Sequence, residues 1–245
     1  MYIRKVTMWV KRDALHTFSD IYAQSVMPAL RGTDGCLFAA LVQDVRDHNL
    51  CASLTMWRTR EKAAEYERSG LFEHLVSILR HLFQDPSGWG GTNLSDDLHL
   101  DFAPTPERPS VVGFENQSVP EKHSPTLPYF THLLSLKSRS DKVGEFRQHY
   151  TQNILSLYSP QKGFMDAFLM HRIEEHHMFY ILSFWDGTAD PSDIMRNETV
   201  DEIVDRSRDV LSTVGSEAAG KAEDGEGTAS HVYRCLRAEW FAKKT

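Results

Sequence analysis

The sequence aligns with itself when it is shifted by 128 residues, and this internal repeat constrains the fold more than any other feature. Ten residues are identical over the 45 positions that begin at Asp13, and no gap is needed. Among them, Gly35 matches Gly163 and Trp57 matches Trp185. Self-similarity at a fixed offset indicates one structural unit used twice. We therefore predict two copies of one domain.

Residues 104–128 separate the two copies and contain six prolines. Proline removes an amide donor and favours extended or turn backbone, so we predict a linker here. The domains are then residues 1–103 and residues 129–245. The second domain also contains residues 215–230, a segment rich in glycine, alanine and charged residues, which we predict to be a mobile insert.

Hydrophobic spacing in the first copy predicts the order β-α-β-β-α-β. Strand-like alternation at the start gives way to apolar residues at intervals of three and four, with Asp13 as the expected N-cap of the first helix. A polar turn at 46–49 then joins two apolar runs into a hairpin. The predicted elements are strands at 2–10, 36–45, 50–57 and 98–102 and helices at 13–30 and 60–83.

The second copy repeats this order. A split β-α-β unit of this kind builds an antiparallel sheet with two helices on one face, which is the ferredoxin-like motif. The other sheet face needs a partner, so we predict an α+β fold in which the tandem ferredoxin-like repeats form an intramolecular dimeric α/β barrel. The chain is then a pseudo-dimer, which could also associate as a homodimer. The predicted elements are strands at 129–136, 164–173, 178–185 and 231–239 and helices at 141–158 and 192–214.

Composition excludes several classes of partner and localisation. The formal charge is −7 and the pI is 5.9, which gives no general reason to bind nucleic acid. Three cysteines do not make a disulfide framework in a chain of 245 residues, so we expect a reducing, cytoplasmic setting. No apolar stretch approaches the roughly 20 residues that a bilayer requires, so no membrane partner is expected. Phosphate-loop, zinc-protease and serine-hydrolase motifs are also absent from the sequence.

Four features of the first copy suggest a family. Gly35 follows the first predicted helix, Leu54–Trp57 ends a strand, Arg58–Glu61 opens the next helix, and Ser69–His74 lies within that helix. This pattern resembles the antibiotic biosynthesis monooxygenase domain, a dimeric α/β-barrel family, over nearly all of residues 1–103. The second copy keeps the glycine and the tryptophan but loses the Ser-x-x-Phe segment, so it resembles the family less closely.

The resemblance implies a pocket between each sheet and its helices. It implies a monooxygenase that oxidises an aromatic or polycyclic small molecule with dioxygen, without a dedicated metal or flavin, so no cofactor is predicted. In such members the deprotonated substrate itself passes an electron to dioxygen. A different alternative is a non-catalytic ligand-binding or scaffolding protein, whose pocket its own side chains would fill.

Haem binding or haem degradation is a further alternative, with haem as substrate or ligand. Haem-degrading members resemble one another in an Asn, a Trp and an iron-ligating His. Their positions fall at or near Val6, Tyr66 and Ser77 here, so none is matched. His74 and His81 flank Ser77 on the same predicted helix and could reach an iron instead.

The candidate catalytic residues are His74, Tyr66 and Trp57. His74 would act as a base or orient a phenolate, Tyr66 would donate a hydrogen bond to a substrate oxygen, and Trp57 would form an apolar wall. The candidate substrate-binding residues are Tyr22, Ile78 and His81. Each has a structural alternative, since the histidines can be solvated flanking residues and the aromatic residues can belong to the core.

A histidine cluster in the second copy is the one candidate metal site. His171, His176 and His177 are close in sequence, and imidazole is a common metal ligand. They fall on a strand and at its hairpin turn, where Glu174 and Glu175 are the only further ligands nearby. We therefore predict no metal site.

Overall fold

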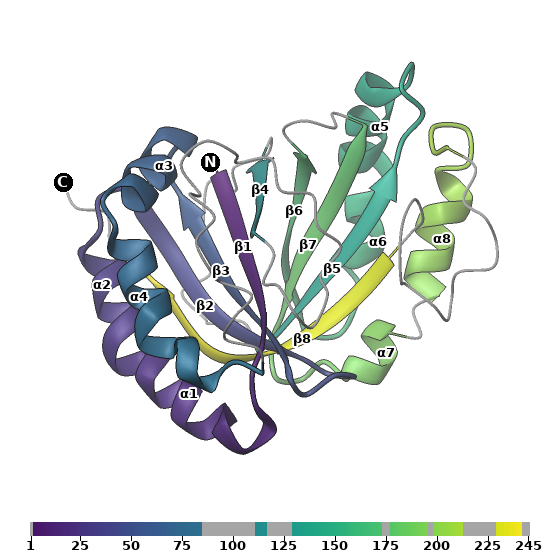
Figure 1. Ribbon diagram of the computed structural model, residues 1–245. Helices are drawn as coiled ribbons and strands as arrows, with labels where there is room; N and C mark the ends of the chain where they lie inside the picture. The colour runs from purple at the N-terminus through teal and green to yellow at the C-terminus, as the bar shows by residue number, and fades with distance from the viewer. Residues whose placement is uncertain are drawn as a thin grey trace. The chain divides into compact units, whose positions relative to one another are not determined.

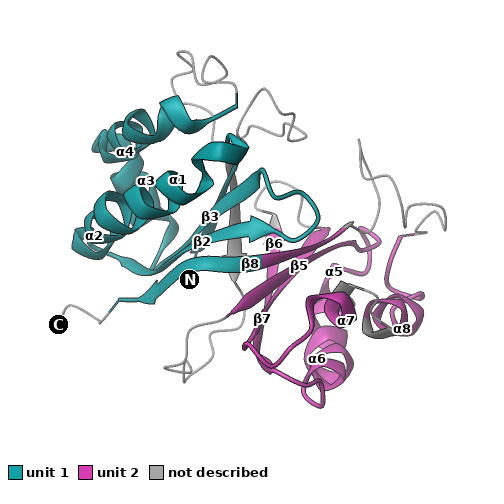
Figure 2. Ribbon diagram, turned by 90° about the horizontal axis from the view of Figure 1, so that it is seen from below, with its two compact units in different colours: residues 1–115, 234–245 teal, residues 116–233 magenta. Residues whose placement is uncertain are grey.

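The computed structural model describes residues 2–84, 111–116, 129–172, 177–195, 198–212 and 229–241. The chain divides into two compact units, which Figure 2 distinguishes by colour. Unit 1 comprises residues 1–115 and 234–245, and unit 2 comprises residues 116–233. No described helix is long and apolar enough to cross a membrane.

Unit 1 is an antiparallel sheet with its helices on one face (Figure 1). Its strands lie in the order β4-β1-β3-β2, and β8 follows β2. In unit 1, β8 contributes residues 234–240. The elements of unit 1 are β1 (Tyr2–Trp9), a 3-10 turn (Arg12–Ala14), α1 (Leu15–Ile21), a π-helical segment (Tyr22–Val26), α2 (Met27–Gly32), β2 (Cys36–Asp44), β3 (Leu50–Trp57), α3 (Arg60–Arg68), α4 (Leu71–Leu79), a second 3-10 turn (Arg80–Leu82) and β4 (Val111–Asn116).

Unit 2 has the same plan, with strand order β8-β5-β7-β6. In unit 2, β8 contributes residues 229–233. The predicted insert at 215–230 lies almost wholly outside the described residues. The elements of unit 2 are β5 (Phe130–Lys137), α5 (Val143–His149), a π-helical segment (Tyr150–Ile154), α6 (Leu155–Tyr158), β6 (Phe164–Arg172), β7 (Met178–Trp185), α7 (Pro191–Met195) and α8 (Glu198–Arg206), with β8 spanning Ala229–Trp240.

The 128-residue repeat extends to backbone detail. The bridge between Val10 and Phe83 recurs between Ser138 and Leu211 at the same offset. Both π-helical segments begin at matching tyrosines. The turn glycines also match, with φ of 82° in the first repeat and 79° in the second. The predicted order of elements is therefore confirmed in both units as far as the chain is described.

Two local predictions for unit 1 are wrong. Asp13 does not cap the first helix, because it lies inside a 3-10 turn and no side chain caps that turn or α1. The first helix itself forms as predicted, with the π-helical segment inside it. The predicted helix 60–83 ends at Arg68 and restarts at Leu71, because Gly70 between them has φ of +76°, a left-handed conformation that interrupts an α-helix.

The strand beside β1 comes from an unexpected segment. The predicted strand 98–102 lies outside the described residues. On the side of β1 away from β3, the pairing strand is β4, and it lies within the segment predicted as a linker. The prolines of that segment occur on either side of β4, and valines open the strand itself, which agrees with the β propensity of branched residues.

Candidate functional site

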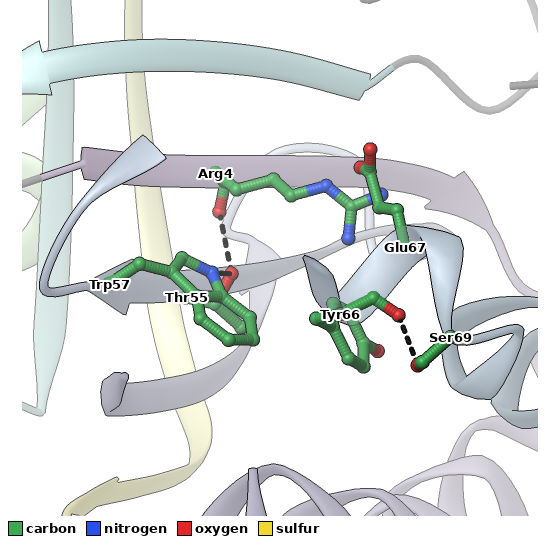
Figure 3. Close-up of polar contacts among 6 residues, drawn as sticks. All are labelled: Arg4, Thr55, Trp57, Tyr66, Glu67 and Ser69. Carbon is green, nitrogen blue, oxygen red and sulfur yellow. Dashed lines mark hydrogen bonds and ion pairs between the residues drawn. The ribbon is translucent and has the colours of Figure 1, made fainter. Parts of the chain in front are cut away.

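A buried guanidinium lies between the sheet and the helices of unit 1. Arg4 on β1 is 2% exposed, and its Nη2 lies 2.6 Å from Glu67 Oε1 on α3 (Figure 3). Its Cζ atom lies 4.0 Å from the ring centroid of Phe72 and 5.8 Å from that of Tyr66. Its Nε has no hydrogen-bond partner within the described part of the chain. The buried, charged Arg4 guanidinium therefore has N–H donors that the protein satisfies only in part.

Trp57 and Tyr66 form an aromatic pair next to this charge. Their ring centroids are 5.0 Å apart, and Trp57 is completely buried at the end of β3. Trp57 Nε1 donates a hydrogen bond of 2.9 Å to Thr55 Oγ1. Thr55 in turn donates to the carbonyl oxygen of Arg4, its cross-strand neighbour, at 3.4 Å (Figure 3). These bonds fix Trp57 against the strand that carries Arg4.

Tyr66 contributes a neutral phenol to this group. It is 5% exposed, and burial raises its pKa while the charge of Arg4 opposes that rise. Ser69 donates to the Tyr66 carbonyl oxygen at 2.6 Å and accepts from the amide of Leu71, which ties Tyr66 to the break between α3 and α4. A protonated Tyr66 can donate a hydrogen bond to a ligand oxygen.

Tyr22 lies against the same face of the sheet. Its side chain is 1% exposed, and its hydroxyl lies 2.8 Å from Ser53 Oγ on β3. Burial raises the pKa of Tyr22, and the hydrogen bond with Ser53 opposes the rise. The π-helical segment that begins at Tyr22 is a feature often found at functional sites. Because the Tyr22 hydroxyl already has a hydrogen-bond partner, Tyr22 is better suited to contact a ligand with its ring than to donate a hydrogen bond to it.

The structure brings together three of the six predicted site residues. Tyr22, Trp57 and Tyr66 are all buried on the helix-covered side of the sheet. His74 and His81 are exposed, the first on α4 and the second in the turn that follows it. Ile78 is intermediate in exposure.

Arg4 was missed by the sequence reasoning, although a signal for it exists. In a strand whose side chains alternate between two faces, Arg4 shares its face with Tyr2, Val6 and Met8. These three are buried, so a charged residue among them must find a counter-charge inside the unit. The counter-charge is Glu67, which is distant in sequence and could not be assigned without the fold.

The described residues contain no group of three or more metal-ligating side chains. Of the histidine cluster considered above, His171 is buried on β6, His177 has intermediate exposure, and His176 lies outside the described residues. The unit 2 residue at the Arg4 position is His132, which is completely buried.

Comparison with a family model identifies the first repeat. Residues 1–77 match the model described as antibiotic biosynthesis monooxygenase. Residues 1–77 are therefore similar to an antibiotic biosynthesis monooxygenase domain. The match covers Arg4, Trp57, Tyr66 and Phe72, so all of the buried group described above lies inside the domain. No curated protein matches the sequence significantly.

Solved structures resemble the chain over nearly its whole length. A proposed monooxygenase from Fusobacterium nucleatum has a TM-score of 0.66 at 10% identity, with 98% of this chain and 94% of that one covered. A second from Lactobacillus acidophilus has a TM-score of 0.63 at 7% identity, with coverage of 98% and 96%. An anthrone oxidase-like protein has a TM-score of 0.52 at 11% identity, with coverage of 100% and 95%.

These likenesses confirm the predicted fold class, α+β with tandem ferredoxin-like repeats of the dimeric α/β-barrel type. At such low identity they establish the fold and leave the chemistry to be argued from the site. The family model describes residues 1–77, and the likeness in fold extends over both repeats.

Proposed function

We propose that the antibiotic biosynthesis monooxygenase domain oxidises an uncharged aromatic or polycyclic phenol or aryl ketone with dioxygen. The observation that carries the proposal is the buried Arg4 guanidinium, which has an unused Nε donor beside the Tyr66 phenol and the Trp57 ring. A buried cation next to a neutral donor and an aromatic wall favours a flat ligand that becomes an oxyanion.

The reaction needs the substrate to lose a proton to solvent water first. Deprotonation of an activated CH₂ or phenol gives an electron-rich anion, and Arg4 would stabilise its negative oxygen in a site of low polarity. Tyr66 would donate a hydrogen bond to the same oxygen. The anion then reduces dioxygen. The CH₂ carbon becomes a carbonyl carbon with one oxygen atom of O₂, and the other oxygen atom leaves as water with the two hydrogens of that carbon.

The comparisons support this substrate class without naming the substrate. One protein with the same fold is an anthrone oxidase-like protein, so oxidation of a tricyclic aryl ketone lies within the chemistry suggested for the fold. His74 and His81 take no part in the proposal, because both are exposed. The haem alternative therefore has no supporting contact among the described residues around Trp57 and Tyr66.

Anthrone is a suitable test substrate, because its oxidation to anthraquinone changes its absorbance. The purified protein should consume one O₂ for each anthraquinone formed, at a rate well above the uncatalysed reaction. Arg4→Met should lower kcat about 100-fold, the usual effect of removing one group that stabilises an oxyanion. Tyr66→Phe should lower it about tenfold.

Arg31→Met is the matched control, because Arg31 also pairs with a glutamate, Glu239, but on the exposed surface. It should leave kcat unchanged. If anthrone and related phenols are not oxidised faster with the protein, or if folded Arg4→Met retains full activity, the proposed function is wrong.

A further inference from the structure

Glu67 balances the charge of the buried Arg4 guanidinium. Its side chain is only 13% exposed, and its Oε1 lies 2.6 Å from Arg4 Nη2. In the described part of the chain, no other cation is paired with Glu67. Two opposite charges held this close, and both largely removed from water, form a pair with no net charge. A ligand that reaches Arg4 therefore meets a buried dipole, not an isolated cation.

The positive end of this dipole faces the aromatic pair. Figure 3 shows Glu67 above the guanidinium and the rings of Trp57 and Tyr66 below it. The pKa of Tyr66 reports the same order of distances. Burial raises that pKa, the charge of Arg4 lowers it, and the charge of Glu67 raises it by a smaller amount than the Arg4 effect. Arg4 therefore dominates the field at the rings, and Glu67 acts on them from farther away.

The second repeat shows that the two charges occur together. The offset of 128 residues places His132 at the Arg4 position and Met195 at the Glu67 position. Methionine has no charge, and burial lowers the pKa of His132 to about 4, so its ring is neutral at pH 7. Unit 2 thus has neither charge at these positions, whereas unit 1 has both. Glu67 is therefore best explained as the partner of Arg4.

The balance of charge decides which ligands can afford to leave water next to Arg4. An aryl carboxylate would lose the hydration of a full charge, and Glu67 would cancel part of its attraction to the guanidinium. An uncharged aryl carbonyl loses much less hydration. It can still accept a hydrogen bond from Arg4 Nε, which has no partner among the described residues.

We infer that Glu67 is a specificity-determining residue, which makes the site at Arg4 take uncharged aromatic compounds and reject those that arrive as anions, such as aryl carboxylates. The inference rests on the proposed function in placing the ligand beside Arg4, but it does not require the oxidation. Glu67 acts through Arg4 and takes no part in the chemical step.

The test is calorimetric titration of the full chain with 2-naphthamide and 2-naphthoate, which share a ring system and nearly a shape but differ in charge at neutral pH. The wild type should bind 2-naphthamide at least about tenfold more tightly. Glu67→Gln should tighten the binding of 2-naphthoate about tenfold and change that of 2-naphthamide less than about threefold. A purely structural role of Glu67 predicts the opposite, since a loosened site would bind both compounds more weakly.

Three further variants separate charge from other effects. Glu67→Asp keeps the negative charge, so it should still reject 2-naphthoate. Arg4→Met/Glu67→Gln removes both charges and should gain no affinity for 2-naphthoate. Glu239→Gln is the matched control, because it changes the net charge of the chain equally but at the more exposed pair with Arg31. It should leave the binding of both compounds unchanged.

The wild-type comparison does not depend on any variant, and circular dichroism at the titration temperature shows whether Glu67→Gln is folded. The inference is overturned if the wild type does not bind 2-naphthamide or binds 2-naphthoate as tightly. It is also overturned if folded Glu67→Gln gains no affinity for 2-naphthoate, or if Glu239→Gln gains as much. A protein that selects by charge in this way but does not oxidise anthrone would overturn only the proposed reaction. A protein that oxidises anthrone without this selection would overturn only the role of Glu67.

Discussion

The hydroxyl of Tyr22 lies 2.8 Å from Ser53 Oγ, whereas its counterpart Tyr150 has no hydrogen-bond partner among the described residues. Tyr22→Phe should therefore lower the free energy of unfolding by about 1 kcal/mol, because it leaves Ser53 without its partner. Tyr150→Phe should leave stability unchanged or raise it. Urea unfolding followed by circular dichroism gives both values, and equal losses in the two variants would mean that Tyr150 is hydrogen-bonded after all.

Removing only one charge of the ion pair between Arg4 and Glu67 should destabilise the protein strongly. Glu67→Gln leaves the buried guanidinium without a counter-charge, and we expect it to lower the free energy of unfolding by about 3 kcal/mol. The double variant Arg4→Met/Glu67→Gln should recover part of this loss, since no buried charge remains. Urea unfolding of both variants checks the prediction.

An exposed pair provides the comparison. Arg31 Nη2 lies 2.6 Å from Glu239 Oε2, the same separation as in the buried pair, but these side chains are 55% and 33% exposed. Glu239→Gln should cost less than about 1 kcal/mol, because water and salt screen the exposed charges. If it costs as much as Glu67→Gln, burial is not what makes the Arg4 pair important.

The repeat is the reason that so much of the fold could be predicted from one sequence. Each copy supports the secondary structure predicted for the other, so the predicted order of elements did not depend on any single segment. Local details of the backbone were harder to predict. Apolar spacing runs across Gly70 without a break, and the spacing alone does not show that its φ is positive. The strand β4 was missed because the prolines around it favoured a linker.

The candidate site was predicted less completely than the fold. Matching repeat positions pointed to Trp57 and Tyr22, and the family resemblance pointed to Tyr66. Arg4 was missed because its role depends on Glu67, 63 positions later, and on a ring stack with Phe72. Such contacts follow from tertiary packing and leave no local pattern in the sequence.

Glycine at the turn before the second strand of each repeat should be hard to replace. Gly163 has φ of +79°, and a Cβ there would lie 2.7 Å from the backbone nitrogen of Ala189. Gly163→Ala should destabilise the protein by about 3 kcal/mol, from backbone strain and the close contact together. Gly70→Ala should cost only about 1 kcal/mol, because φ is +76° but nothing lies within 4 Å of the added carbon. If thermal or urea unfolding shows that both variants lose the same free energy of unfolding, the structure relieves the contact with Ala189 at no cost.

A hemin titration tests the haem alternative directly. Because His74 and His81 are exposed whereas Trp57 and Tyr66 are buried, we expect no saturable Soret shift that depends on either histidine. His74→Ala and His81→Ala should give the same spectra as the wild type. A one-to-one complex that either variant abolishes would contradict this and favour haem as a ligand.

The buried histidine of unit 2 should make stability fall in mild acid. Burial lowers the pKa of His132 from 6.5 to about 4, with the nearby His231 adding to the shift. The unfolded chain therefore binds a proton more readily than the folded one between these values. The stability that the neutral His132 side chain contributes is fully present above pH 6.5. It is lost as the pH falls toward 4, which lowers the free energy of unfolding by up to about 3 kcal/mol.

His132→Gln removes this titration while keeping a side chain that can hydrogen-bond Ser230. Partial burial also lowers the pKa of His149, but that residue is present in both proteins, so its effect cancels in the difference. The free energy of unfolding, measured by urea at several pH values from 7 to 4, should fall more steeply for the wild type than for the variant. Parallel curves would mean that His132 gains its proton without loss of the fold, for example by turning toward solvent.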